Sequence, residues 1–279
     1  MDFLERRGCP STLPVPTSTL ALFVTSMDLA GYAVPTIATS LSAVSYVHKL
    51  AGFPDPAESF LLRKVREGMV RSTPAREPKC GISLELLNEM VLYLSSSQWP
   101  DASLYKAIFV LAFHLCSRIG ELVSSGGSAQ HALRTNQVFI EKRNGVPVSI
   151  RVVFHSYKHK QPKGQVVRVV SATGGPSCPV ATLVSYLSEG HWSQNEDYLF
   201  TSSPGRPVLA HEVRARLNIV LKALGRDPAK YSTHSFRIGG ATAAAIQGAS
   251  DAQLRMLGRW SSSAFLSYIR PGAFRFQYK

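Results

Sequence analysis

The sequence has no stretch that would place it in a membrane or export it from the cell. Its 279 residues contain no uninterrupted apolar run of about 18 residues, the length at which a membrane-spanning helix becomes a candidate. The first residues are charged and interrupted by Pro10 and Pro14, unlike the apolar core of a secretory signal. We therefore expect a soluble, intracellular protein with no membrane partner.

Cysteine is also scarce. The four cysteines, Cys9, Cys80, Cys116 and Cys178, are far apart and form no CxxC pair. This spacing favours a reducing compartment and predicts no metal site of the structural zinc type. The sequence contains no internal repeat and no low-complexity tract.

Acidic residues are too few to balance the basic ones. The chain has 31 Lys and Arg but only 18 Asp and Glu, which gives a formal net charge of +13 and a pI near 9.8. This charge favours a polyanionic partner, because neutralising phosphates releases counterions and drives association. A basic protein without such a partner is the alternative. The 45% of hydrophobic residues suffices for one large or two modest domains.

The N-terminal part predicts an irregular arm, a small helical domain and a linker. Residues 1–16 are broken by prolines, and residues 17–70 contain three amphipathic helical patterns. Residues 71–81 are rich in proline and charge without periodicity, as an interdomain linker is. The apolar stripes of the three helices are Leu20, Phe23, Val24 and Met27, then Ile37, Leu41, Val44 and Val47, then Phe60, Leu61 and Val65.

Two helices are predicted to open the second domain, residues 82–279. Ser83 is a good N-cap for the first, and the second, residues 103–116, is apolar nearly all round and therefore buried. Arg118 follows, with Glu121 three residues later. A buried arginine needs a partner, and Glu121 can hold its guanidinium while leaving donors free for a phosphate. A purely structural ion pair is the alternative.

The pattern then changes to strands. Residues 138–140, 149–155 and 165–171 are strand-like, and Asn144-Gly145 is a strong hairpin signal. We expect a three-stranded antiparallel meander. The fold class is therefore mainly α with a small antiparallel β-meander, an α+β arrangement. The second turn of the meander is basic, with Lys158, Lys160 and Lys163.

The C-terminal stretch, residues 231–270, gathers side chains that suit phosphate chemistry. His234 and Arg237 lie at i and i+3 at the start of a predicted helix. There the two side chains, the free amide donors and the helix dipole together favour an anion. After a further short helix come Trp260 and a last helical turn that carries Tyr268.

Four short motifs carry a family resemblance. HSFR at 234–237, LGRW at 257–260 and SYIR at 267–270 resemble the C-terminal signature of the tyrosine recombinases, the phage-integrase family, and SRIGEL at 117–122 resembles its first arginine box. The residues of these motifs are most similar to those in the recombinases of eukaryotic tyrosine-recombinase retrotransposons and Crypton elements. The resemblance implies a helical, DNA-binding N-terminal domain followed by a tyrosine-recombinase catalytic domain.

The resemblance also implies a role for each matched residue. Tyr268 would attack a DNA phosphodiester and form a 3′-phosphotyrosine. Arg118, Arg237 and His234 would stabilise the charge of the transition state, the effect that usually contributes most. His234 could also help to remove the proton of the tyrosine.

Two assignments within the family pattern have alternatives. Lys158 would protonate the leaving 5′-oxygen, with Lys160 as the other candidate. Many family members have a histidine where this chain has Arg259. We assign that position to Trp260, which would bond the phosphate through its indole N–H or pack the pocket.

The implied function is that of a site-specific recombinase or integrase of a mobile element. It would break and rejoin double-stranded DNA as a tetramer, without metal, ATP, another cofactor or a small-molecule substrate, and in the nucleus if its host is eukaryotic. Nicking and resealing as in type IB topoisomerases is one alternative, and a domesticated, non-catalytic DNA-binding protein is another. The residues expected to contact DNA outside the pocket are Lys160, Lys163, Arg76, Lys79, Arg214 and Arg259.

The charge predicts that DNA binding depends steeply on salt. With about six phosphates neutralised, affinity should fall by roughly 10³ between 50 and 200 mM salt, because each contact releases counterions. Fluorescence anisotropy of a labelled random-sequence duplex measures this fall. A flat titration contradicts a nucleic-acid partner.

Overall fold

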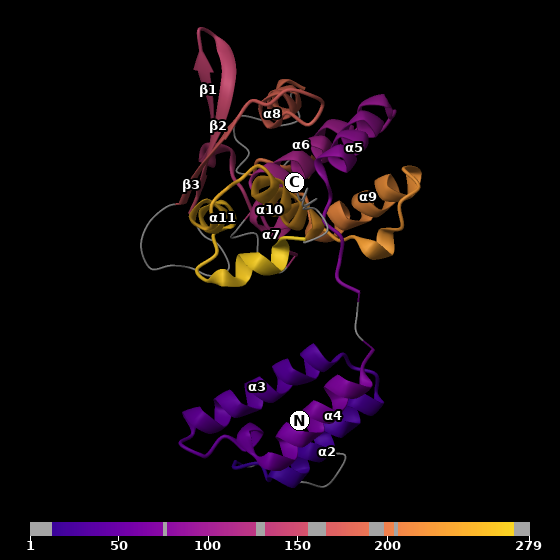
Figure 1. The fold of residues 1–279 in the computed structure, drawn as a ribbon, viewed down its shortest axis with the longest axis vertical. Helices are drawn as coiled ribbons and strands as arrows, with labels where there is room; N and C mark the ends of the chain where they lie inside the picture. The colour runs from indigo at the N-terminus through magenta and orange to yellow at the C-terminus, as the bar shows by residue number, and fades with distance from the viewer. Residues whose placement is uncertain are drawn as a thin grey trace, which may run out of the picture. The chain divides into compact units, whose positions relative to one another are not determined.

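The computed structural model divides into two compact units, Met1–Glu77 and Pro78–Lys279 (Figure 1). It describes residues 13–74, 77–126, 132–155, 166–189, 198–203 and 206–270. The boundary between the two units falls inside the predicted linker, residues 71–81. Near the end of that linker, the N–H of Cys80 donates to the carbonyl of Lys230 in the larger unit at 2.8 Å.

The smaller unit contains the three predicted helices. They are α2 (Thr17–Leu29), α3 (Val34–Leu50) and α4 (Phe60–Ser72), with a 3₁₀ turn, η1 (Pro56–Glu58), before α4. The hydroxyl of Ser59 caps α4 by accepting the N–H of Leu62 at 3.3 Å. The shared core of the unit consists of Leu20, Val24, Ile37, Leu41, Leu62 and Met69.

The predicted buried face of α3 was partly wrong. Val47 is 47% exposed, and the neighbouring His48 is fully buried instead. Nε2 of His48 accepts the N–H of Val15 at 2.9 Å, and Nδ1 lies 2.8 Å from the carbonyl of Val44. Because both ring nitrogens have partners, the imidazole can fill a core position that the apolar pattern assigned to valine.

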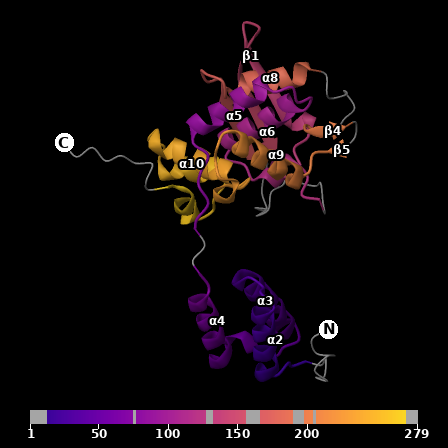
Figure 2. The ribbon, with the colours of Figure 1, turned by 90° about the vertical axis from the view of Figure 1, so that its right-hand side faces the viewer.

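The larger unit is built around α6 (Ala102–His114), which is buried along almost its whole length, as its apolar sequence predicts. Three helices pack on it: α5 (Leu84–Ser96), α8 (Pro179–Ser188) and α10 (Ser235–Ile246) (Figures 1 and 2). A fourth helix, α9 (Ala210–Ala223), packs on α5. The shorter elements are α7 (Ile119–Leu122), η2 (Thr135–Gln137), η3 (Pro228–Lys230), α11 (Asp251–Gly258) and η4 (Ser263–Tyr268).

The predicted meander is confirmed. Strands β1 (Val138–Arg143), β2 (Val146–Phe154) and β3 (Val166–Ser171) pair antiparallel in that order and pack against α8. Asn144 and Gly145 form the first turn with φ of 51° and 81°, the left-handed backbone that this pair favours. A smaller hairpin joins β4 (Thr201–Ser203) to β5 (Arg206–Pro207). The fold is mainly α with a small antiparallel sheet, as predicted.

Among the described residues, no helix is both long and apolar enough to cross a membrane.

Two glycines let α10 approach its neighbours closely. A Cβ on Gly239 would lie 1.7 Å from the carbonyl oxygen of Ile82, and one on Gly240 would lie 2.2 Å from that of Phe113 on α6. Both obstacles are backbone, so a side chain could fit only if a segment moved. The glycines therefore let the start of α10, which carries Arg237, lie against both the end of α6 and the segment at Ile82.

We expect Gly239→Ala to lower the free energy of unfolding by about 1–3 kcal/mol or more, because the added methyl overlaps the backbone at Ile82. Thermal unfolding followed by circular dichroism measures the loss. Gly174→Ala is the matched control, since nothing lies within 4 Å of its Cβ position. Equal melting temperatures for the two variants would contradict the close contact.

Candidate active site

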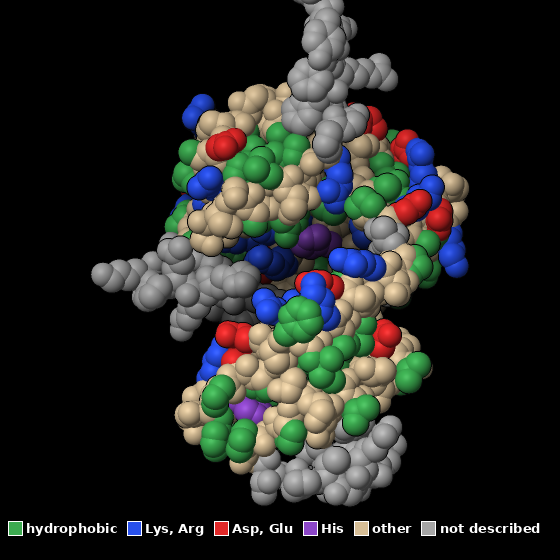
Figure 3. Space-filling model, turned by 60° about the horizontal axis from the view of Figure 1, so that its bottom comes forward, with side chains coloured by type: hydrophobic (Ala, Val, Ile, Leu, Met, Phe, Trp, Pro, Cys, Tyr) green, Lys and Arg blue, Asp and Glu red, His purple; other side chains and the backbone are tan. Residues whose placement is uncertain are grey.

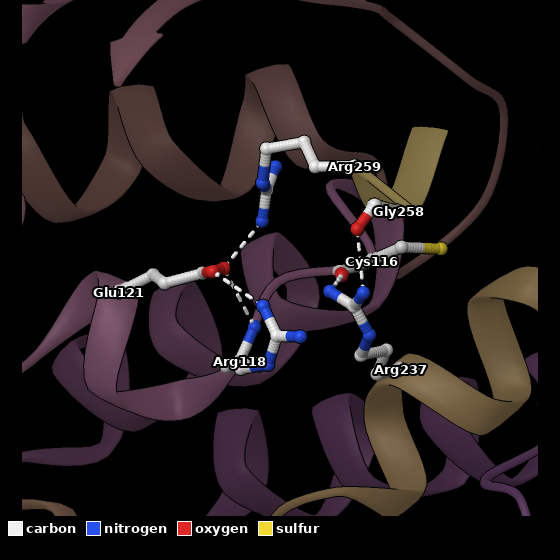
Figure 4. A network of polar contacts seen from close by, with 6 residues as sticks. All are labelled: Cys116, Arg118, Glu121, Arg237, Gly258 and Arg259. Atoms are coloured by element: carbon white, nitrogen blue, oxygen red, sulfur yellow. Dashed lines mark hydrogen bonds and ion pairs between the residues drawn. The ribbon is translucent and has the colours of Figure 1, made fainter. Parts of the chain in front are cut away.

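Arg237 is a fully buried cation bound by backbone carbonyls. Its Nη1 donates to the carbonyl of Cys116 at 2.7 Å, and its Nη2 donates to that of Gly258 (Figure 4). Cys116 follows α6 with a φ of 45°, a left-handed turn that directs its carbonyl towards the arginine. Burial, followed by the charge of Arg118, lowers the pKa of Arg237 to about 10, so the guanidinium stays charged at neutral pH.

Two aromatic rings enclose this cation. The Cζ of Arg237 lies 4.3 Å from the ring centre of Trp260 and 5.3 Å from that of Tyr268, and both contacts favour a cation over an aromatic face. Gly258 makes room for the indole, because a Cβ there would lie 2.0 Å from it. The buried indole N–H has no acceptor within the described part of the chain. The indole ring packs on Arg237, and the predicted bond from its N–H to a phosphate stays a prediction.

The predicted ion pair between Arg118 and Glu121 is present. One carboxylate oxygen of Glu121 accepts from Nη1 of Arg118 at 3.1 Å, and the other accepts the backbone N–H of Arg118 at 2.9 Å. The side chain of Glu121 is 3% exposed and that of Arg118 is 24% exposed. The carboxylate thus anchors the arginine from inside and leaves part of the guanidinium accessible to a ligand.

Arg259 points away from its neighbour Trp260. It ends α11 in the left-handed conformation, with a φ of 57°, and its side chain is 2% exposed. Its Nη2 donates to Glu121, and its Cζ lies 4.4 Å from the ring centre of Phe154 on β2. The guanidinium of Arg259 is thus directed at Glu121 and Phe154, and its predicted contact with DNA stays a prediction.

His234 lies at the start of α10, beside Tyr268, with ring centres 5.0 Å apart. His234 is partly exposed to solvent. Its partial burial, followed by the charges of Arg237, Arg118 and Arg270, lowers its pKa to about 4. The ring is therefore neutral at physiological pH and can accept a proton on one nitrogen.

Tyr268 ends η4 and is only half-buried. Its carbonyl accepts the hydroxyl of Thr242 on α10 at 3.1 Å. Earlier in η4, Phe265 is fixed in a small core with Leu254 and Trp260. The backbone of the tyrosine is therefore anchored, while its ring contacts three other predicted site residues, namely His234, Arg237 and Trp260.

The structure gathers these predicted residues from distant parts of the sequence. We call Arg118, His234, Arg237, Trp260 and Tyr268 the tyrosine cluster. Arg118 and the neighbouring Arg259 share the single carboxylate of Glu121, and Arg237 adds a third positive charge close to them. On the face seen in Figure 3, Lys and Arg side chains lie around a histidine. The excess positive charge suits a phosphodiester, which gains negative charge as it is attacked.

The remaining predicted site residues are lysines and expected DNA contacts, and only some of them fall within the described residues. Lys158, Lys160 and Lys163, between β2 and β3 in the sequence, lie outside the described residues, as does Arg76. Arg214 is exposed on α9. Lys79 is exposed as well, and its ammonium donates to the carbonyl of Ala229.

Sequence reasoning missed the groups that hold the arginines. The carbonyls of Cys116 and Gly258 and the second partner of Glu121, Arg259, were not predicted. Backbone acceptors leave no side-chain signal in a sequence. The one available signal was Gly258 itself, since a glycine at the end of a short helix marks a turn that can send the next two side chains in different directions.

Solved structures show what the fold is similar to. The Tn1549 transposon integrase in complex with circular intermediate DNA has a TM-score of 0.61 and 17% identity, covering 94% of this chain and 83% of that chain. A lambda integrase dimer bound to a COC′ core site has a TM-score of 0.60 and 14% identity, covering 100% and 73%. The XerH recombinase bound to a palindromic difH substrate has a TM-score of 0.63 and 12% identity, covering 96% and 71%. No protein-family model and no curated protein sequence matches the chain.

The chain has the tyrosine-recombinase fold. The predicted fold class is confirmed by these structures and by the helical larger unit with its small antiparallel sheet. Within this tyrosine-recombinase fold, the motifs HSFR, LGRW, SYIR and SRIGEL contribute their matched residues to the tyrosine cluster.

We expect His234 to titrate near pH 4 in the DNA-free protein. Because the unfolded chain takes up this proton near pH 6.5, the contribution of His234 to stability is lost as pH falls from about 6.5 towards 4. NMR of labelled imidazoles, titrated from neutral to acidic pH, measures the midpoint. Arg270→Gln should raise the midpoint by removing one of the cations. An unperturbed midpoint near 6.5 in the wild type would contradict the geometry.

Proposed function

We propose that the protein is a site-specific DNA recombinase or integrase that breaks and rejoins DNA strands through a 3′-phosphotyrosine intermediate. The observation that carries the proposal is the position of the Tyr268 ring against His234 and Arg237, with Arg118 close to both. A tyrosine hydroxyl beside guanidinium groups and a neutral imidazole is what attack on a phosphodiester requires. The tyrosine-recombinase fold supports the same function.

Cleavage on this cluster exchanges one phosphoester bond for another. The phenolic oxygen of Tyr268 bonds to phosphorus and loses its proton, the bond from phosphorus to the 5′-oxygen breaks, and that oxygen takes up a proton. The phosphotyrosine bond conserves the energy of the broken ester. Attack by the 5′-hydroxyl of another strand reverses the step and completes the exchange, so the balanced reaction consumes no nucleotide and no redox equivalent.

Each residue of the cluster has a part in this step. Arg118 and Arg237 would neutralise the non-bridging oxygens as phosphorus becomes pentacoordinate. His234 would accept the proton of the tyrosine, since its lowered pKa leaves a ring nitrogen free at neutral pH. Lys158 is our candidate for protonating the leaving oxygen, with Lys160 as the alternative.

The proposed partners are duplex DNA and further copies of the chain. The Tn1549 and lambda integrase structures contain DNA, which supports a DNA partner here. Complete exchange between two duplexes cuts both strands of each, and every chain supplies one Tyr268, so we propose a tetramer. The residues of the LGRW and SYIR motifs favour a eukaryotic tyrosine-recombinase retrotransposon or Crypton element as the source of the protein. In that case the protein would act in the nucleus.

The nucleophile can be tested on a nicked suicide duplex, from which the cleaved fragment diffuses away so that the covalent complex accumulates. We expect an adduct with the wild type, stable to denaturing electrophoresis and formed in EDTA, and none with Tyr268→Phe. That variant loses only a hydroxyl and keeps the ring contacts, so its melting temperature and DNA affinity should be nearly unchanged.

Tyr231→Phe is the matched control, because it removes a phenolic hydroxyl outside the cluster and should leave the adduct in place. An adduct that survives in Tyr268→Phe refutes the assignment. Relaxation of supercoiled DNA by a monomer, without exchange between duplexes, would favour the topoisomerase-like alternative. No adduct from the wild type on any duplex would favour a non-catalytic DNA-binding protein.

A further inference from the structure

We infer that Arg259 is a positioning residue for strand cleavage, which acts through Glu121 to fix the guanidinium of Arg118. The inference rests on the proposed function and adds a residue to which the mechanism above gives no role. Its basis is the network in Figure 4, in which one buried carboxylate joins both arginines.

Within the described residues, the carboxylate of Glu121 accepts its hydrogen bonds from these two arginines. One oxygen accepts from Nη1 of Arg118 at 3.1 Å, and the other accepts the backbone N–H of Arg118 at 2.9 Å together with Nη2 of Arg259. The position of Glu121 thus sets both the backbone and the side chain of Arg118. Without Arg259, the carboxylate would lose the partner that holds it from the protein side.

The backbone conformation of Arg259 and its contacts with Phe154 and Glu121 hold its side chain in one position. Its left-handed backbone directs the side chain into the protein, where the guanidinium stacks on Phe154 at 4.4 Å from the ring centre. Its Nε and Nη1 are buried without an acceptor within the described part of the chain, so the bond to Glu121 and the stack on Phe154 define its position. The preceding Gly258 accepts from Arg237, and the following Trp260 packs on it. The turn of residues 258–260 therefore fixes both phosphate-facing arginines.

The positive charge of Arg259 also affects how strongly Arg118 attracts a phosphate. A buried carboxylate paired with Arg118 alone would form a neutral pair and weaken the attraction of that arginine for a phosphate. With Arg259 present, two cations share one anion and the group keeps a net positive charge. Arg118 can therefore be held in place and still stabilise a developing negative charge.

The test is a double-mutant cycle on single-turnover cleavage of the suicide duplex at saturating protein. We expect Arg259→Gln to slow cleavage on the order of 10²-fold, because a small misplacement of a catalytic group has an effect of that size. Its DNA affinity should stay near that of the wild type. Adding Arg259→Gln to Glu121→Gln should cause no further loss, since Arg259 is inferred to act only through that carboxylate.

Two further variants separate positioning from a general loss of charge or folding. Arg255→Gln removes an exposed arginine from the same helix without touching Glu121, and it should cleave at the wild-type rate. Arg259→Lys keeps the charge but not the planar fork, so it should restore part of the rate, and it decides the question if Arg259→Gln does not fold. Circular dichroism checks the folding of each variant.

The outcomes distinguish this inference from the proposed function. A wild type that forms no adduct refutes the proposed function. A cleaving wild type with an equally fast Arg259→Gln overturns the positioning role alone. Losses that multiply when Glu121→Gln and Arg259→Gln are combined would show that Arg259 acts independently of the carboxylate, and they also overturn it.

Discussion

The burial of Arg237 is the constraint on which the rest of the site depends. A guanidinium removed from water is tolerated only where its charge and donors are satisfied. No carboxylate bonds to Arg237 among the described residues. Two backbone carbonyls and two aromatic faces surround it instead, and its buried Nε has no acceptor within the described part of the chain. Each of these groups needs a particular local structure, namely the left-handed turn at Cys116, the glycine at 258 and the anchored 3₁₀ helix that carries Tyr268.

The groups that position the cluster belong to the chain itself. The ring of the proposed nucleophile is itself part of the shell around Arg237, and Glu121 fixes Arg118 from the protein interior. Oriented charges that need no rearrangement during the reaction are the most effective way to stabilise a developing negative charge. Burial and, after it, the same cations lower the pKa of His234, so the imidazole stays neutral as a proton acceptor beside the tyrosine.

Sequence reasoning succeeded where interactions between residues close together in the sequence determine the structure. The apolar surface of α6, the Asn144-Gly145 turn and the pairing of Arg118 with Glu121 each follow from a pattern a few residues long, and each is present. It failed where distant segments compete for a position. His48 replaced Val47 in a core because a segment far away in the sequence supplied a partner for its ring. The bond between Arg259 and Glu121 was missed because the two residues lie far apart in the sequence. The tyrosine cluster was found through short motifs, whereas the carbonyls that hold it carry no sequence signal.

The central claim, that Tyr268 is the nucleophile of a DNA-cleaving cluster, is tested most directly by identifying the residue joined to DNA. Wild-type protein trapped on a suicide duplex would be digested, and the peptide that retains a nucleotide would be sequenced by mass spectrometry. The account predicts one modified peptide, with the phosphate on Tyr268. Attachment to Tyr231, to Tyr278 or to a residue that is not a tyrosine would contradict it.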